Sequence, residues 1–102
     1  MSKGIYINNQ TGEQVEAIRY FGDEDGASEE DAEFNARECL RFLGDAVVKF
    51  DLDDLDEGVV FESGVDQRRM VWGGWYIVRH ATNEFNSLSP GAFSGLYTER
   101  QS

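Results

Sequence analysis

Hydrophobic and polar residues in the first half of the chain follow two patterns in turn, one typical of strands and the other of a helix. Segments 4–7 and 15–21 are rich in β-branched and aromatic residues, and turn-forming residues separate them at 8–12. Farther along, Ser28 occupies a helix N-cap position, acidic residues follow it, and apolar residues then recur at helical spacing. The pattern therefore predicts a β-hairpin and then a helix over Glu29–Leu43, with a glycine after it.

The expected helix is amphipathic, with one exception. At about 100° per residue its apolar side chains form a single stripe, made of Ala32, Ala36, Cys39, Leu40 and Leu43. We expect this stripe to pack on a sheet. Phe34 falls on the opposite, charged side of the helix, where an exposed aromatic side chain is a candidate anchor for a partner.

The second half of the chain consists of short strand-like segments separated by glycine or turn residues. The expected strands are 46–50, 59–62, 68–72, 75–79 and 85–88. After them, Ser89 and Pro90 pair an N-cap with a first-turn proline, and Phe93 and Tyr97 share one face of a short helix. The predicted fold class is α+β: a small antiparallel-rich sheet with one main helix packed on one face, an N-terminal β-hairpin and a short C-terminal helix.

Length and composition predict a single acidic domain over residues 1–102, because a chain of this size supports one modest core. Hydrophobic residues make up 40% of the chain, which excludes disorder throughout. A lone cysteine allows no internal disulfide, and the N-terminus has no hydrophobic export segment, so we expect a cytoplasmic protein. No apolar run approaches the roughly 20 residues that span a bilayer, so no membrane segment is expected.

The negative charge is concentrated in one segment. The chain has a net charge of −11, and residues 23–62 alone carry −12. This charge argues against direct binding to nucleic acid or anionic lipid and favours a basic partner. The alternative is a solvated face that only promotes solubility. The candidate partner-binding residues are Asp23, Glu24, Asp25, Glu29, Glu30, Asp31, Phe34, Asp51, Asp53, Asp54, Asp56 and Glu57.

The sequence contains no recognisable catalytic or cofactor motif. The segment 51–62 resembles a calcium-binding loop only superficially, because Leu55 and Asp56 stand where an oxygen ligand and a glycine are needed. His80 is the only histidine, and Cys39 lies on the apolar helix stripe, where an inert buried thiol is expected. Neither a serine-hydrolase elbow nor a phosphate-binding loop is present. We therefore predict no catalytic residues, no metal, no cofactor and no enzymatic activity.

Aromatic residues crowd the C-terminal third and leave a second kind of site open. We expect most of them to belong to the core. Alternation along a strand places Trp75 and Tyr76 on opposite faces, however, so at least one of the two is expected at the surface. An aromatic pocket for a nucleotide or another small ligand is therefore an alternative to the acidic surface.

The stretch from Gly74 to Tyr97 resembles a C-terminal pattern common in small phage and prophage proteins of unknown role. The matching positions are Gly74, Tyr76, Ile77, Arg79, Glu84, Phe85, Pro90, Phe93 and Tyr97, and the segment 15–18 is similar to an early Val-Glu-Ala-Ile strand of that family. Two turn glycines of the family are His80 and Asn83 here, and the family's basic opening stretch is replaced by a hairpin arm. Asparagine tolerates a left-handed turn, so Asn83 keeps the expected hairpin possible.

The resemblance implies a phage-encoded accessory protein that acts in the host bacterial cytoplasm. Combined with the acidic composition, it leads to the hypothesis of an anti-CRISPR or other anti-defence inhibitor. Such a protein would bind a basic host protein or ribonucleoprotein complex, as a monomer or homodimer, and occupy its DNA- or RNA-binding site as a partial DNA mimic. The alternatives are a small-ligand or nucleotide-binding module that sequesters a defence signal, and a structural phage accessory protein.

Overall fold

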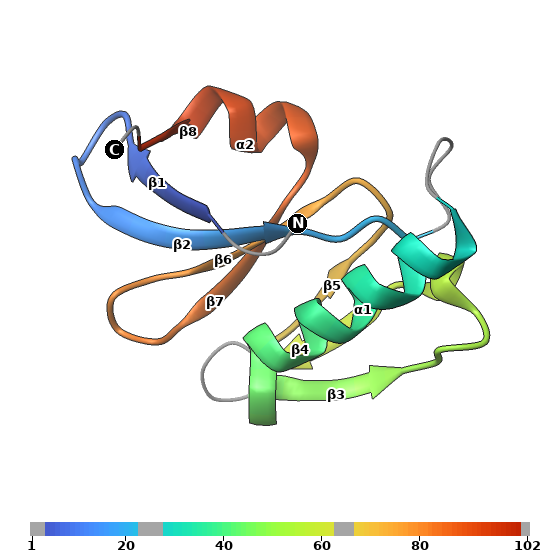
Figure 1. Cartoon of the computed structure of the whole chain (residues 1–102). Coiled ribbons are helices and arrows are strands. Elements are labelled where there is room, and N and C mark those ends of the chain that lie inside the picture. Colours follow the sequence, from blue (N-terminus) through green and yellow to red (C-terminus); the bar gives the residue numbers. More distant parts are fainter. Residues whose placement is uncertain (1–3, 23–27, 63–66, 101–102) are drawn as a thin grey trace.

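The computed structural model describes residues 4–22, 28–62 and 67–100, which form an α+β fold built on two antiparallel sheets (Figure 1). The strands are β1 (Gly4–Asn8), β2 (Gln14–Arg19), β3 (Val47–Phe50), β4 (Val59–Glu62), β5 (Arg68–Val71), β6 (Tyr76–Arg79), β7 (Phe85–Leu88) and β8 (Tyr97–Glu99). The helices are α1 (Glu29–Leu43), α2 (Pro90–Leu96) and two short 3₁₀ helices, Gly44–Ala46 and Leu55–Glu57. The predicted class, N-terminal hairpin, main helix and short C-terminal helix are confirmed.

The strands divide between a five-stranded sheet, in the order β7-β6-β2-β1-β8, and a three-stranded sheet, in the order β3-β4-β5. Every strand pair in both sheets is antiparallel. Tyr97, which the sequence pattern places on the C-terminal helix, instead follows the end of α2 and begins β8, a strand that the pattern does not reveal. Its three residues are too few to show an alternation, and β8 pairs with β1 from the other end of the chain (Figure 1).

Local sequence explains where the helices begin. The Ser28 hydroxyl accepts a hydrogen bond from the Asp31 backbone N–H at 3.1 Å, and three acidic residues occupy the first turn of α1. In α2, the Ser89 hydroxyl accepts from the Ala92 N–H, and Pro90 stands in the first turn. Both helices therefore start at the residues that the capping pattern predicts.

Two hydrophobic clusters hold the sheets and helices together. In the larger one, the α1 stripe packs against Tyr20, Phe61, Val71 and Ile77, and Leu40 is partly buried at its margin. In the smaller one, α2 lies on the opposite face of the five-stranded sheet, and the Phe93 ring stacks on Tyr76 with centroids 3.9 Å apart. Each sheet is thus covered by a helix, and α1 covers only one face of the three-stranded sheet (Figure 1).

A buried polar residue, which no pattern in the sequence singles out, joins α1 to the end of β2. Asn35 is 2% exposed; its Nδ2 donates to the Arg19 carbonyl at 2.7 Å, and its Oδ1 accepts from the Phe21 N–H at 2.8 Å. Between those two residues, the Tyr20 hydroxyl donates to the Leu55 carbonyl at 2.8 Å. The three residues 19–21 therefore hold both α1 and the loop that follows β3.

Candidate functional site

The structure places the predicted acidic residues on two exposed segments. The helix-side acidic group is the first turn of α1, and Phe34 is 56% exposed one turn farther along. The loop-side acidic group lies between β3 and β4. The helix-side group consists of Glu29, Glu30 and Asp31, and the loop-side group consists of Asp51, Asp53, Asp54 and Glu57, all of them exposed. Asp23, Glu24 and Asp25 lie outside the described residues, as does the side chain of Asp56.

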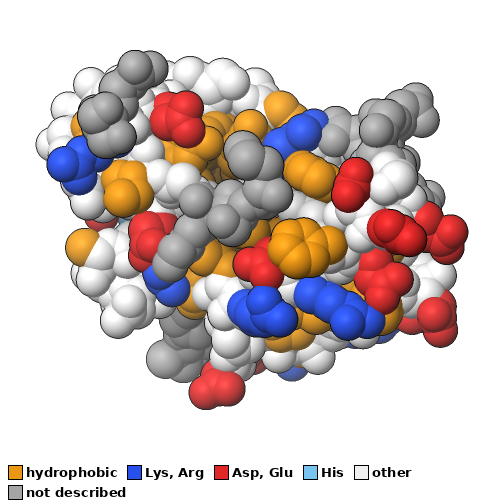
Figure 2. Space-filling model, viewed as in Figure 1, with side chains coloured by type: hydrophobic (Ala, Val, Ile, Leu, Met, Phe, Trp, Pro, Cys, Tyr) orange, Lys and Arg blue, Asp and Glu red, His pale blue; other side chains and the backbone are white. Residues whose placement is uncertain are grey.

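The two acidic groups lie at the same end of the molecule. Hydrogen bonds from Asn35 and to Leu55 tie α1 and the loop to the same stretch of chain, residues 19–21. In Figure 1 the N-terminal end of α1 and the connection after β3 meet at the right, and Figure 2 shows acidic side chains gathered there. The folded chain therefore combines the two acidic groups into one negative surface.

Two carboxylates farther along α1 form ion pairs with arginines on the same helix. Arg37 pairs with Glu33 at 2.7 Å, and Arg41 pairs with Glu38 at 2.6 Å. Within the described part of the chain, no ion pair involves the helix-side acidic group. These exposed carboxylates interact favourably with the helix dipole, and their charge also attracts an approaching cation.

The loop-side acidic group has a defined backbone. The Asp51 carboxylate accepts a hydrogen bond from the Asp53 N–H at 2.9 Å, and the Asp51 carbonyl accepts from the Asp54 N–H at 3.1 Å. The turn continues into the 3₁₀ helix Leu55–Glu57, where the Gly58 N–H donates to the Leu55 carbonyl. Asp51 therefore shapes the loop as well as adding charge, a role that was not expected from the sequence.

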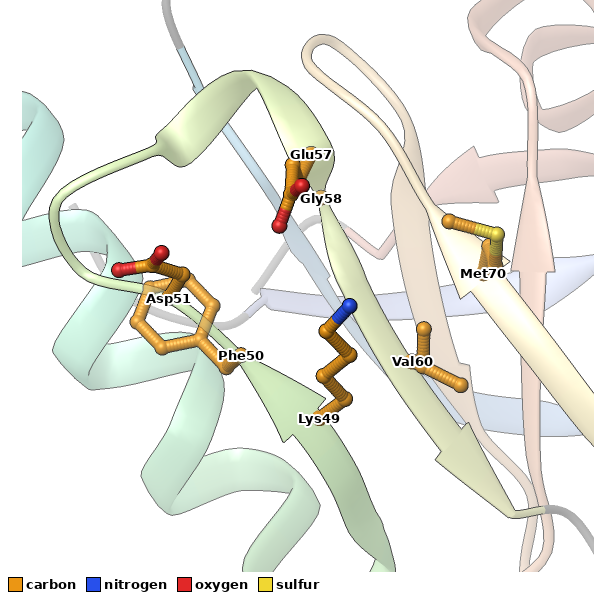
Figure 3. A pocket seen from close by; sticks show the side chains of 7 residues that line it. All are labelled: Lys49, Phe50, Asp51, Glu57, Gly58, Val60 and Met70. Carbon is orange, nitrogen blue, oxygen red and sulfur yellow. The ribbon is translucent and has the colours of Figure 1, made fainter.

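A hollow of about 190 Å³ lies beside this loop on the outer face of the three-stranded sheet (Figure 3). It is lined by Lys49, Phe50, Asp51, Glu57, Gly58, Val60 and Met70. Figure 3 shows Lys49, Val60 and Met70 on one side of the sheet, with Glu57 reaching toward the same space. Sequence reasoning missed this site, although outward apolar positions in β4 and β5 are a signal that could have found it.

A second hollow, of about 350 Å³, lies over β1, β2 and β6 and bears on the ligand-binding alternative. Two of its polar side chains already have partners: Arg79 pairs with Glu16, and His80 Nδ1 lies 3.2 Å from Glu13 Oε1. The Arg79 guanidinium also sits 4.8 Å from the centre of the Phe42 ring. An anionic ligand would therefore compete with the Glu16 carboxylate for the Arg79 guanidinium.

The exposed aromatic residue of the C-terminal third is Trp72, at 41% exposure. Trp75 and Tyr76 are both half-buried and pack into different clusters, so they do lie on opposite faces as expected. The expectation that one of these two is exposed is wrong, because a helix covers each face of the five-stranded sheet at this point. Trp72 is the residue after β5, and its indole ring packs edge-on against Trp75 while 41% of the residue stays exposed.

Cys39 and His80 lie in different parts of the structure. The Cys39 thiol is in the main core, near the Arg19 carbonyl and the Asn35 amide oxygen, whereas His80 pairs with Glu13 at the end of β6. Burial, and to a smaller extent the charge of Glu38, raises the pKa of the Cys39 thiol to about 12. The thiolate, which is the nucleophilic form, is therefore strongly disfavoured at neutral pH.

We expect Cys39 to react slowly with an aromatic disulfide reagent in the folded protein. At about pH 8 its rate should be at least about 100-fold below that of the urea-unfolded chain, because both access and the thiolate fraction are reduced. Absorbance of the released thiol measures both rates. Similar rates in the two states would contradict the buried, protonated thiol.

Neither a metal cluster nor a membrane helix is found in the portions of the chain that the structure describes. No three histidine, cysteine or acidic side chains there are grouped to hold a metal ion. Within the same residues, no helix has the length and apolar character needed to cross a bilayer.

Comparisons with protein-family models, with curated proteins and with solved structures give no match for this chain. The positions that carry the resemblance to phage proteins have structural roles here. Asn83 adopts φ 67 in the turn between β6 and β7, as expected of an asparagine in place of a turn glycine. Tyr76, Phe93 and Tyr97 form stacked rings. Their spacing is thus explained by packing.

Proposed function

We propose that this chain is a phage-encoded inhibitor that binds a basic host protein or ribonucleoprotein complex and blocks its DNA- or RNA-binding site. The proposed target is a nucleic-acid-binding defence complex in the bacterial cytoplasm, as for an anti-CRISPR protein. The observation that carries the proposal is the joint negative surface at one end of the molecule, built from the helix-side and loop-side acidic groups.

Electrostatics supports this function over a purely solubilising role. The segment 23–62 concentrates a charge of −12, and exposed like charges held this close repel one another in the free protein. A cationic groove that binds phosphates would remove that repulsion and gain attraction on contact, and its field would speed the encounter. The same field disfavours nucleic acid itself as the ligand.

A displacement experiment tests the proposal. The immobilised chain is used to capture proteins from a bacterial lysate at about 0.05 M salt, and bound proteins are eluted at about 0.5 M, where the Debye length is much shorter. Each captured protein is then given a labelled oligonucleotide, and the free chain is added. We expect the chain to displace the oligonucleotide, with an efficiency that falls as salt rises.

The control is the same chain with the loop-side acidic group and Asp56 changed to Asn or Gln. Capture by this variant at undiminished levels, or a ternary complex in which chain and oligonucleotide bind together, would contradict the proposal. An affinity that does not change with salt concentration would instead favour a small-ligand-binding module or a structural phage protein.

A further inference from the structure

The outer face of the three-stranded sheet carries a small apolar strip, which no described helix covers, next to the ion pair of Glu62 and Arg68. Its inner face, with Val59, Phe61 and Val71, is fully buried under α1. On the other side, Met70 is 36% exposed and Val60 is half-buried, and these two residues are opposite each other in the β4–β5 register. Exposed apolar residues on a small domain are individually ordinary, but a contiguous platform beside charged groups is a typical feature of binding surfaces.

Trp72 extends this platform toward the acidic loop. A Cβ placed on Gly58 would lie 3.5 Å from Trp72 Cδ1, so the indole ring lies directly beside the glycine that lines the hollow. The ring is also held edge-on against Trp75, with centroids 4.8 Å apart, and Trp75 packs against the main core. The tryptophan is therefore both exposed and fixed in place, which lowers the entropy lost when a partner packs on it.

The same hollow is bordered by acidic side chains and already contains one cationic side chain. Asp51 and Glu57 line it, and Lys49 extends along Val60 with its ammonium group toward the Glu57 side (Figure 3). Within the described residues Lys49 has no ion pair. Lys49 thus illustrates how an aliphatic stem on an apolar strand can present a cation to these carboxylates.

We propose that this groove, defined by Lys49, Asp51, Glu57, Val60, Met70 and Trp72, binds an extended segment of a basic protein partner. The segment presents an arginine whose stem lies on Val60 and Met70 and whose guanidinium lies between Asp51 and Glu57, and it presents a neighbouring apolar side chain to Trp72. This inference rests on the proposed function and names the part of the acidic surface that makes the specific contact.

Charge decides between this occupant and the other possible ones. A second copy of the chain, docked face to face, would bring a second Asp51 and a second Glu57 into the same interface, which adds repulsion between like charges. A nucleic acid would bring phosphates to them. A basic, partly apolar peptide segment complements both the platform and its acidic border.

The groove can be tested with a short peptide in which arginine alternates with leucine. Nuclear magnetic resonance titration of the isotope-labelled full chain should show the largest backbone shifts at Lys49, Gly58 and Met70, with a change at the Trp72 indole N–H. Replacing the leucines of the peptide by glycine should weaken binding about tenfold, because the platform loses its apolar partner. Glu57→Gln and Trp72→Ala should each weaken binding about fivefold or more.

Lys49→Met and Arg41→Met form a matched pair, since each removes one positive charge from an exposed site. Lys49 lies in the groove, whereas Arg41 is paired with Glu38 on α1. We expect Lys49→Met to tighten peptide binding about threefold more than Arg41→Met does. The reason is that the Lys49 ammonium group repels the arginine of the bound peptide, whereas Arg41 lies outside the groove. If the two variants had equal effects, or if Lys49→Met bound the peptide more weakly, the groove would not be the peptide-binding site.

Other outcomes separate this inference from the proposed function. Shifts confined to the first turn of α1 and Phe34 would overturn the groove, and the displacement experiment would still decide the inhibitor role. Equal binding of the leucine and glycine peptides would mean a non-specific acidic surface and would also overturn the groove. Sedimentation that shows self-association, lost in Trp72→Ala, would assign the face to a second copy instead.

Discussion

Neutralising the loop-side acidic group together with Asp56 is expected to weaken binding to a basic partner about tenfold to a hundredfold at low salt. The change is Asp to Asn at 51, 53, 54 and 56, and Glu to Gln at 57. Each exposed ion pair across an interface contributes about 0.2–1 kcal/mol, so five of them add about 1–5 kcal/mol. A tenfold to hundredfold loss of affinity, about 1.4–2.7 kcal/mol, lies in the lower half of that sum. The loss should shrink as salt rises, because screening already weakens the same attractions in the unchanged protein.

The free protein should fold at least as well after these substitutions. The carboxylates repel one another across a short loop, so their removal relieves the native state slightly. Asparagine at position 51 retains a side-chain oxygen that can accept the hydrogen bond now made by the Asp53 N–H. Changing the helix-side group instead should lower stability, by about 0.3–1 kcal/mol per charge, because those residues also interact with the dipole of α1.

A pair of double variants provides the control for general charge effects. Asp53→Asn with Asp54→Asn, and Glu84→Gln with Glu99→Gln, each remove two exposed negative charges. Calorimetry against the captured partner at about 0.05 and 0.5 M salt, on either side of a 10 Å Debye length, measures the affinities. Equal losses in the two double variants would mean that only net charge matters and would contradict a localised acidic site.

Gly58→Ala is expected to be the most destabilising single change, with a loss of at least about 3 kcal/mol in the free energy of unfolding. Gly58 has φ 77, a conformation in which an L side chain is strained. An added Cβ would also lie 2.3 Å from the Val71 carbonyl oxygen. That oxygen belongs to the backbone of a fully buried residue, so it cannot move aside without disturbing the β4–β5 pairing.

Gly12→Ala separates the two sources of strain. Gly12 has a nearly identical φ of 75, in the turn between β1 and β2, but a Cβ added there would have nothing within 4 Å. Gly12→Ala should therefore lower the free energy of unfolding only by the cost of backbone strain, about 1–2 kcal/mol. Urea denaturation of both variants measures the difference. Similar losses at the two glycines would show that the sheet adapts to the added methyl group.

The candidate site was only partly accessible from sequence. The exposed carboxylates and Phe34 were predicted individually, because charge and helical periodicity are properties of neighbouring residues. Their meeting at one end of the molecule depends on hydrogen bonds from Asn35 and Tyr20 to residues far away in the chain. The sequence does not reveal such bonds, because asparagine and tyrosine side chains also occur exposed at the surface, where water satisfies their polar groups.

The groove, too, was predictable from the sequence only in part. Alternation in β4 and β5 assigns Val60 and Met70 to one face, but it does not say which face a helix covers. That choice is made when α1 packs on Val59, Phe61 and Val71. Lys49 joins the groove because a bulge in β3 shifts its register against β4, an irregularity that the pattern of residue types does not reveal.

By itself the sequence determined the elements whose signals are local: the two capped helices, the hairpins, the left-handed turn at Asn83 and the concentration of negative charge in one segment. Only the tertiary structure decided how the strands divide between two sheets, that β8 pairs with β1, and which faces stay open. The physical reason is that caps, turns and periodicity act between near neighbours. Strand pairing and burial instead depend on contacts between distant residues, whose free energy is shared by the whole fold.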